Sequence, residues 1–139
     1  MDQNSIIKSY KRVSSIYDYT FGKVFKPGQE TAIEKMNCNS EDQVLEIGIG
    51  TGSSLKYYPS DTKVVGIDIS PDMLSLANQK IIKGKIPNKN IAMMNGEELF
   101  FDDNTFDKVV AMYVISVTHN PKKLISEMKR VCKEDGDIF

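Results

Sequence analysis

The sequence lacks the features that define several large classes of protein. Its 139 residues carry 18 basic and 19 acidic side chains, so the basic excess of a dedicated nucleic-acid-binding protein is absent. No apolar run approaches the roughly 18 residues of a membrane-spanning helix. The polar residues 1–5 do not resemble the start of a signal peptide. We therefore expect a cytoplasmic protein without a nucleic-acid partner.

Cysteine clusters, repeats and low-complexity tracts are absent as well. Cys38 and Cys132 lie far apart in the chain, outside any metal-binding spacing, and they predict ordinary reduced thiols and no bound metal. The length, with 40% hydrophobic residues, fits a single globular domain. We expect residues 1–139 to form one domain.

Segments with the patterns of strands and helices alternate from residue 43 onward. Strands are predicted at residues 43–47, 63–68, 91–94 and 107–113. Helices are predicted after Ser70 and after Asn120, because each is a capping residue followed by proline. The second of these helices has its buried stripe at Leu124, Ile125, Met128, Val131 and Cys132. The alternation predicts an α/β fold, a mostly parallel sheet with helices on both faces.

Two further segments carry predictions about the ends of the chain. A helix is predicted to start at Pro27, with Thr31, Ala32, Ile33 and Met36 facing inward. Residues 134–139 predict a turn and then the first residues of a fifth strand. We therefore expect a domain truncated at the start of that strand. An incomplete sheet would leave an open edge for self-association.

The stretch from Val44 to Gly52 indicates a nucleotide-type pocket. An apolar strand leads into Gly48, Gly50 and Gly52, and glycine lets a ligand approach the main chain closely. The last glycine of the dinucleotide fingerprint is missing, and no phosphate-binding Gly-Lys-Ser/Thr follows. Glu46 at the strand end would repel a pyrophosphate and attract a cation. These features favour an uncharged nucleoside joined to a cation; a nucleotide-dependent oxidoreductase is the less favoured alternative.

Asp68 is the candidate ligand for a ribose. It ends the second predicted strand, where an acid can accept hydrogen bonds from both ribose hydroxyls. Because NAD and other adenosine ligands share this feature, Asp68 alone does not discriminate between them. A helix-capping or turn-forming role is the alternative.

These motifs together resemble the class I S-adenosylmethionine-dependent methyltransferases. They are Glu46-x-Gly48-x-Gly50-x-Gly52, Asp68 after the next strand, and Asn95-Gly96-Glu97-Glu98-Leu99-x-Phe101 after the third. The resemblance implies a Rossmann-like enzyme that uses S-adenosyl-L-methionine and releases S-adenosyl-L-homocysteine. It implies cofactor contacts at Tyr17, Glu46, Gly48, Gly50, Gly52, Asp68, Ile69, Met73, Asn95, Gly96, Glu97, Tyr113 and Val114.

The resemblance also implies a role for each part of this set. The glycine turn would lie against the methionine moiety and the ribose, and Ile69 and Met73 would flank the adenine. Asn95, where the family usually has Asp, would accept the adenine amino group through its carbonyl oxygen. Tyr113 and Val114 would border the transferring methyl group.

A narrower resemblance concerns residues 17–28 and 113–117, which are similar to bacterial phosphatidylethanolamine N-methyltransferases and, more distantly, to ubiquinone/menaquinone-biosynthesis methyltransferases. It implies N-methylation of phosphatidylethanolamine or a similar lipid or small-molecule acceptor. The alternatives are C-methylation of a quinone precursor, or a cofactor-binding fragment made inactive by truncation. It further implies that residues 1–36 form a helical lid, with Tyr17 or Tyr19 reaching the cofactor unless both tyrosines only pack on the core.

Methyl transfer from a sulfonium needs mainly positioning and desolvation, but an amine acceptor must first lose a proton. His119, the single histidine, is the candidate base, because histidine accepts protons near neutral pH; Tyr19 and Asp18 are further candidates. Residues 118–121 equally predict a loop that leads into a helix cap. The predicted helix at residues 6–16 carries Lys8, Lys11 and Arg12 beside apolar residues, a pattern of an interfacial helix peripheral to the inner membrane or of an ordinary solvated one.

Overall fold

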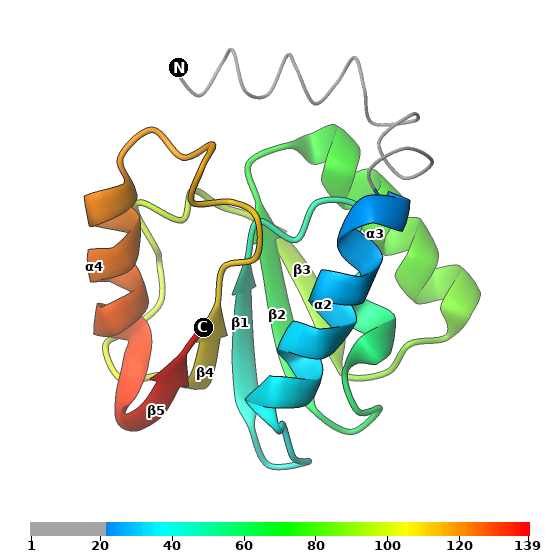
Figure 1. The fold of residues 1–139 in the computed structure, drawn as a ribbon, viewed down its shortest axis with the longest axis horizontal. Coiled ribbons are helices and arrows are strands. Elements are labelled where there is room, and N and C mark those ends of the chain that lie inside the picture. Colours follow the sequence, from blue (N-terminus) through cyan, green and yellow to red (C-terminus); the bar gives the residue numbers. More distant parts are fainter. Residues whose placement is uncertain (1–21) are drawn as a thin grey trace.

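The computed structural model describes residues 22–139, and all statements below concern these residues. The helix predicted at residues 6–16, Asp18 and the two candidate tyrosines, Tyr17 and Tyr19, lie outside them. The elements, drawn in Figure 1, are α2 (Gly22–Met36), β1 (Gln43–Ile47), the 3-10 helix η1 (Leu55–Tyr57), β2 (Lys63–Asp68), α3 (Pro71–Gly84), β3 (Lys89–Met93), β4 (Phe106–Val110), α4 (Pro121–Val131) and β5 (Cys132–Ile138). None of these helices is both long and apolar enough to cross a membrane.

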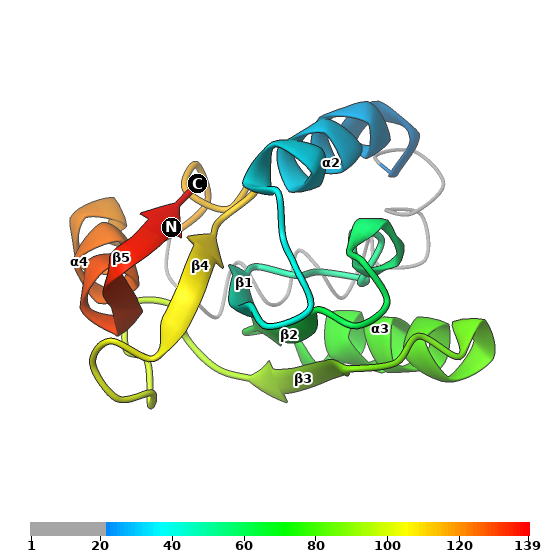
Figure 2. The same ribbon diagram turned by 90° about the horizontal axis from the view of Figure 1, so that it is seen from below.

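The strands form one parallel sheet in the order β3-β2-β1-β4-β5. In Figure 2, α4 lies on one side of this sheet, and α2 and α3 lie on the other. The predicted α/β fold with helices on both faces is therefore confirmed. All carboxyl ends of the strands meet at one edge, which is where such folds bind ligands.

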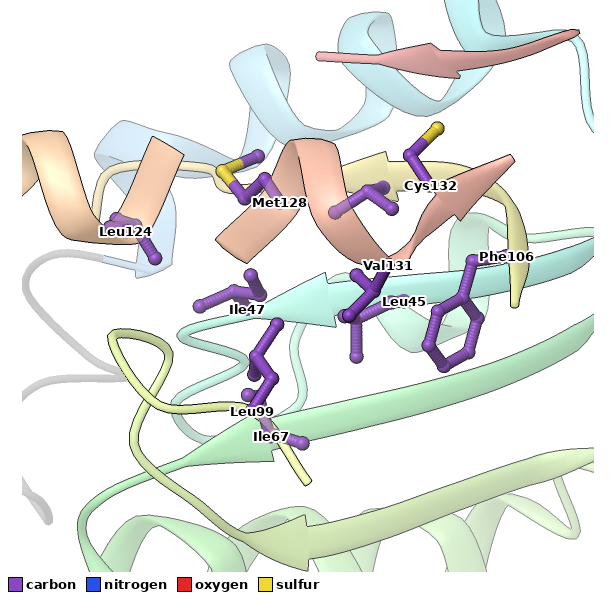
Figure 3. Packing of buried hydrophobic residues seen from close by; sticks show 10 residues of the cluster. Leu45, Ile47, Ile67, Leu99, Phe106, Leu124, Met128, Val131 and Cys132 are labelled. Atoms are coloured by element: carbon purple, nitrogen blue, oxygen red, sulfur yellow. The ribbon is translucent and has the colours of Figure 1, made fainter. Parts of the chain in front are cut away.

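Two hydrophobic clusters attach the helices to the sheet. Leu45 and Ile47 pack with Leu124, Met128 and Val131 of α4, and Figure 3 shows this cluster. Val44, which directly precedes Leu45 in the strand, packs with residues of α2, η1 and α3 on the opposite face. Successive strand residues point to opposite faces of a sheet, so β1 is buried on both sides. Each fully buried aliphatic side chain contributes about 1.5–3 kcal/mol.

Both predicted helix caps are confirmed. The Ser70 hydroxyl accepts a hydrogen bond from the Met73 N–H at 3.3 Å, and the Asn120 carbonyl oxygen accepts one from the Lys123 N–H at 3.1 Å. In each case proline occupies the first turn of the helix, where its missing N–H costs no helical hydrogen bond. The helices that follow β2 and precede β5 thus begin where local chemistry predicts.

Several predicted boundaries and faces are wrong. Helix α2 begins at Gly22 and contains Pro27, which lies early enough in the helix that the lost hydrogen bond falls near its start. Thr31 is exposed, while Ile33 and Met36 are buried. Ile125, expected in the buried stripe of α4, is 42% exposed, because it lies on the side of the helix away from the sheet.

The ends of two strands also differ from prediction. Strand β4 stops at Val110, and Tyr113 has a φ of 58°, a left-handed conformation that cannot continue a strand. Strand β5 already begins at Cys132, so the turn expected within residues 134–139 falls inside the strand. Its pairing places Cys132 opposite Phe106 but Asp137 opposite Lys108, so the turn residues form a bulge within the strand.

Candidate functional site

A pocket opens at the carboxyl ends of β1, β2 and β4, and its walls come from residues far apart in the sequence. Most of the predicted cofactor-binding residues line it. They are Gly48, Gly50, Asp68, Ile69, Met73, Asn95, Gly96, Glu97, Tyr113 and Val114. The three sequence motifs therefore converge on one cavity, although they were identified separately.

The glycine turn, residues 48–52, is hydrogen-bonded to the sheet, and at Gly50 its backbone has free space beside it. The N–H groups of Gly48 and Ile49 both donate to the Ile67 carbonyl, at 2.8 and 3.0 Å. A side chain at Gly48 would come within 2.7 Å of Val114, whereas a side chain at Gly50 would meet no protein atom within 4 Å. Gly50, with a φ of 57°, thus leaves room where a ligand can approach the backbone.

Gly52 packs closely against α3. Its φ is 75°, and a methyl group on it would lie 3.0 Å from the Ala77 Cβ of α3. It is not among the lining residues of the pocket. Gly52 therefore permits close packing of the turn against α3, and its predicted cofactor contact has no support in this geometry.

Glu46 likewise lies outside the pocket lining. Its carboxylate is 2% exposed and accepts hydrogen bonds from the Ser54 hydroxyl at 2.7 and 2.9 Å and from the Tyr58 hydroxyl at 2.9 Å. Burial raises the pKa of Glu46 to about 7, even though the two hydroxyls favour its charged form. These bonds connect β1 to the residues that flank η1, and the cofactor contact of Glu46 stays a prediction.

Asp68 joins the glycine turn to the start of α3 at the edge of the pocket. One carboxylate oxygen accepts from the Gly50 N–H and the other from the Ser70 N–H, both at 2.9 Å. Burial raises the pKa of Asp68, and these backbone donors partly offset the effect. Each oxygen has a further lone pair, which can accept a hydrogen bond from a ligand. The capping oxygen of α3 belongs to Ser70, so Asp68 is not the cap, but its bond from the N–H two residues further on is the turn-forming contact expected as the alternative.

Glu97 connects two loops of the pocket wall. It accepts hydrogen bonds from the Thr118 hydroxyl at 2.5 Å and the Asn120 N–H at 2.7 Å. Burial opposes the effect, but these donors together lower the pKa of Glu97 below its ordinary value. The Asn95 carbonyl oxygen accepts from the Glu97 N–H at 3.0 Å. The turn after β3 and the loop after β4 are therefore held together.

The loop after β4 forms one rim of the pocket. Tyr113, which lines the pocket, is 48% exposed, and Ile115 in the same loop is 43% exposed. His119 also lines the pocket and directly precedes the helix-capping residue Asn120. His119 is thus a pocket residue in a loop that leads into a cap, and its role as a base stays a prediction.

Sequence reasoning missed some polar residues of the pocket. Gln29 of α2, Thr51 and Ser53 line it, and the Ser53 hydroxyl donates to the Gln29 carbonyl oxygen at 3.0 Å. The Thr51 hydroxyl accepts from the Lys80 ammonium at 3.0 Å. No motif marks Gln29, because a polar residue on a helix is usually solvated. Its position near Pro27 and Gly28 offered no signal.

Comparison with known proteins agrees with this geometry. A family model described as a methyltransferase domain matches residues 45–139. The phosphatidylethanolamine N-methyltransferase of Cereibacter sphaeroides is 41% identical over 139 residues, which cover 99% of this chain and 68% of that protein. The ubiquinone/menaquinone biosynthesis C-methyltransferase UbiE of Citrifermentans bemidjiense is 30% identical over 112 residues, covering 77% of this chain and 48% of that protein.

A solved structure shows the same likeness. The crystal structure of a SAM-dependent methyltransferase from Aquifex aeolicus superimposes with a TM-score of 0.67 at 25% sequence identity, covering 76% of this chain and 58% of that one. The chain thus spans 68% of the first relative and 48% of the second.

Proposed function

We propose, from the premise that this chain belongs to the class I S-adenosylmethionine-dependent methyltransferase family, that it transfers methyl groups to the amine of phosphatidylethanolamine or a similar lipid. S-adenosylmethionine is the cofactor of this family. The observation that carries the lipid proposal is the 41% identity to a phosphatidylethanolamine N-methyltransferase across the whole chain. The exposed side chain of Tyr113 in the pocket lining, with Ile115 exposed two residues further on in the same loop, supports it, since an acyl-bearing acceptor needs an apolar approach.

The residues present fit the cofactor. Open space beside Gly50 leaves room for a ligand against the backbone, and Asp68 has lone pairs to accept hydrogen bonds from ribose hydroxyls. Ile69 and Met73 supply apolar surface for the adenine, with Asn95 and Gly96 at its edge. We therefore propose that the adenosine lies toward the carboxyl ends of β2 and β3.

At the other end of the pocket, the loop after β4 faces the acceptor in this proposal. When bound, S-adenosylmethionine supplies an electrophilic methyl group on its sulfonium. Val114 and Tyr113 would exclude water around that position. His119, which lines the pocket near its exposed rim, would take the proton that the acceptor amine must lose before it can attack.

Three proposals depend wholly or partly on residues outside the described ones. The lid formed with residues 1–36, the contact of Tyr17 or Tyr19 with the cofactor, and peripheral membrane contact through the predicted first helix all follow from the resemblance stated for the sequence. They stay predictions, as does self-association through an open sheet edge.

An assay with lipid vesicles identifies the methyl acceptor. The protein is incubated with methyl-labelled S-adenosylmethionine and vesicles that contain phosphatidylethanolamine, and label in mono-, di- and trimethylated lipid is measured. Vesicles of phosphatidylglycerol, which has no amine, are the control. Label in neither lipid, combined with tight binding of S-adenosylhomocysteine, would contradict the lipid acceptor and leave the cofactor assignment intact.

The second candidate is C-methylation in quinone biosynthesis, which the 30% identity to UbiE favours. The same labelled assay with a demethylated menaquinol in place of phosphatidylethanolamine tests it. Label in the quinol alone would replace the lipid proposal by this one.

A further inference from the structure

Helix α2 connects the two sides of the pocket through neighbouring residues. A methyl group on Gly28 would overlap the Tyr113 hydroxyl, so the helix backbone lies directly against the loop after β4. The next residue, Gln29, accepts a hydrogen bond from Ser53, which follows the glycine turn of β1. Figure 2 shows α2 on the same side of the sheet as α3, and residues of both helices share one core cluster. This single turn of α2 therefore lies across the β1–β4 end of the pocket.

The side chain of Gln29 is oriented by one bond and has two hydrogens left to donate. Its carbonyl oxygen accepts from the Ser53 hydroxyl at 3.0 Å, and the side chain is half-buried in the pocket lining. Within residues 22–139, no hydrogen bond from its amide nitrogen is present. A primary amide carries two N–H donors on that nitrogen, so both are available to a ligand.

The sheet order indicates which part of the cofactor lies near Gln29. With the adenosine at the ends of β2 and β3, the order β3-β2-β1-β4 places the rest of the molecule over β1 and β4. That part is the methionine moiety, which ends in an ammonium and a carboxylate. Gln29 and Ser53 lie at this end, because they connect α2 to the turn after β1.

Neutral donors line this end of the pocket, and the Lys80 ammonium, which is not a lining residue, donates to the lining hydroxyl of Thr51 at 3.0 Å. Among the described lining residues, the ionisable carboxylates are Asp68 and Glu97, and there is no lysine or arginine. Carboxylates of the protein would repel a carboxylate of the ligand, which is stabilised instead by N–H or O–H donors. A side-chain amide held by a neighbouring hydroxyl supplies such donors without adding charge.

We infer that Gln29 binds the carboxylate of the cofactor's methionine moiety through its amide NH₂ group, with Ser53 fixing the amide orientation. This inference rests on the cofactor placement proposed above. It assigns to α2 a direct part in cofactor recognition, and it explains why a polar side chain of this helix points into the pocket.

The test compares two ligands that differ only at the methionine end. S-adenosylhomocysteine carries the amino-acid group, and 5′-methylthioadenosine lacks it. Calorimetry measures both dissociation constants for the wild-type chain, Gln29→Glu, Gln29→Met and, as a charge-matched control, Gln79→Glu on the exposed face of α3. Thermal unfolding of each variant is recorded in parallel.

The expected result is selective. Gln29→Glu raises the dissociation constant of S-adenosylhomocysteine at least about tenfold, because a hydrogen bond to a charged group is lost and a repulsion is added. Gln29→Met raises it less, and 5′-methylthioadenosine binding is unchanged in both variants. Gln79→Glu changes neither constant.

Equal weakening of both ligands, or no change in either, would overturn the inference. If Gln29→Glu does not fold, the ratio of the two constants in Gln29→Met decides by the same criterion. A wild-type chain that binds neither adenosine ligand would instead refute the cofactor placement, so the two failures are distinguishable.

Discussion

At the scale of single residues, Asp68 carries the adenosine end of the proposed site. It is 6% exposed, and its two oxygens already hold the Gly50 and Ser70 N–H groups. Asp68→Asn should weaken the binding of S-adenosylhomocysteine more than tenfold, since hydrogen bonds to a charged acceptor contribute about 1.5–3 kcal/mol each. Calorimetry measures the constant, with Asp61→Asn in an exposed loop as control. An unchanged constant would remove Asp68 from the ribose role.

Glu46 should make stability depend on pH. Burial raises its pKa to about 7 in the folded chain, above the unfolded value, so the folded state binds the proton more tightly. The free energy of unfolding should therefore fall as the pH rises from about 5 to about 8, by up to about 3 kcal/mol. Carboxylates with a lowered pKa, such as Glu97, change their contribution below this window.

The measurement is urea unfolding of the wild type and of Glu46→Gln at several pH values. The variant keeps the hydroxyl partners Ser54 and Tyr58 but cannot ionise, so its stability should vary less across the window. If both proteins show the same slope, the pH dependence belongs to other groups.

At the scale of elements, two glycines of the same turn should differ in role, Gly50 in ligand binding and Gly52 in packing. Gly50 and Gly52 both have positive φ, 57° and 75°, so alanine costs about 1–2 kcal/mol of backbone strain at either. Gly52→Ala also forces a methyl group against Ala77 and should be the less stable variant. The methyl group of Gly50→Ala meets no protein atom within 4 Å. It therefore enters the pocket, and this variant should bind the cofactor more weakly than Gly52→Ala does.

Urea unfolding and calorimetry with S-adenosylhomocysteine, performed on both variants, give the two comparisons. The reverse order, with Gly52→Ala the weaker binder at equal stability, would mean that Gly52 and not Gly50 faces the ligand.

At the scale of the whole molecule, the pocket lies where several segments distant in sequence meet. Its walls come from α2, the turn after β1, the end of β2, the turn after β3 and the loop after β4. A ligand that contacts all of them binds the folded state and not the unfolded chain. S-adenosylhomocysteine at a hundred times its dissociation constant should therefore raise the free energy of unfolding by about 2.7 kcal/mol.

Thermal unfolding with and without ligand measures this effect, and NAD at the same concentration is the comparison. Stabilisation by NAD and not by S-adenosylhomocysteine would contradict the cofactor, and it would restore the oxidoreductase interpretation of the glycine turn.

The sequence by itself determined what depends on neighbouring residues. Ser70-Pro71 and Asn120-Pro121 start helices because capping and proline geometry act within one turn. The alternation of strands and helices predicted the parallel sheet, and the ends of its strands predicted the pocket. The positions of Asp68 and of Asn95 followed from that, because they come directly after strands.

Only the tertiary structure decided which way side chains face when that depends on distant elements. Glu46 alternates with Leu45 along β1, but η1 and its hydroxyls determine that the Glu46 side is a closed interior. Gly52 packs on α3, and Gln29 enters the pocket, because helices distant in sequence lie against the glycine turn. A local pattern fixes the period of a strand or helix, whereas burial depends on what packs against it.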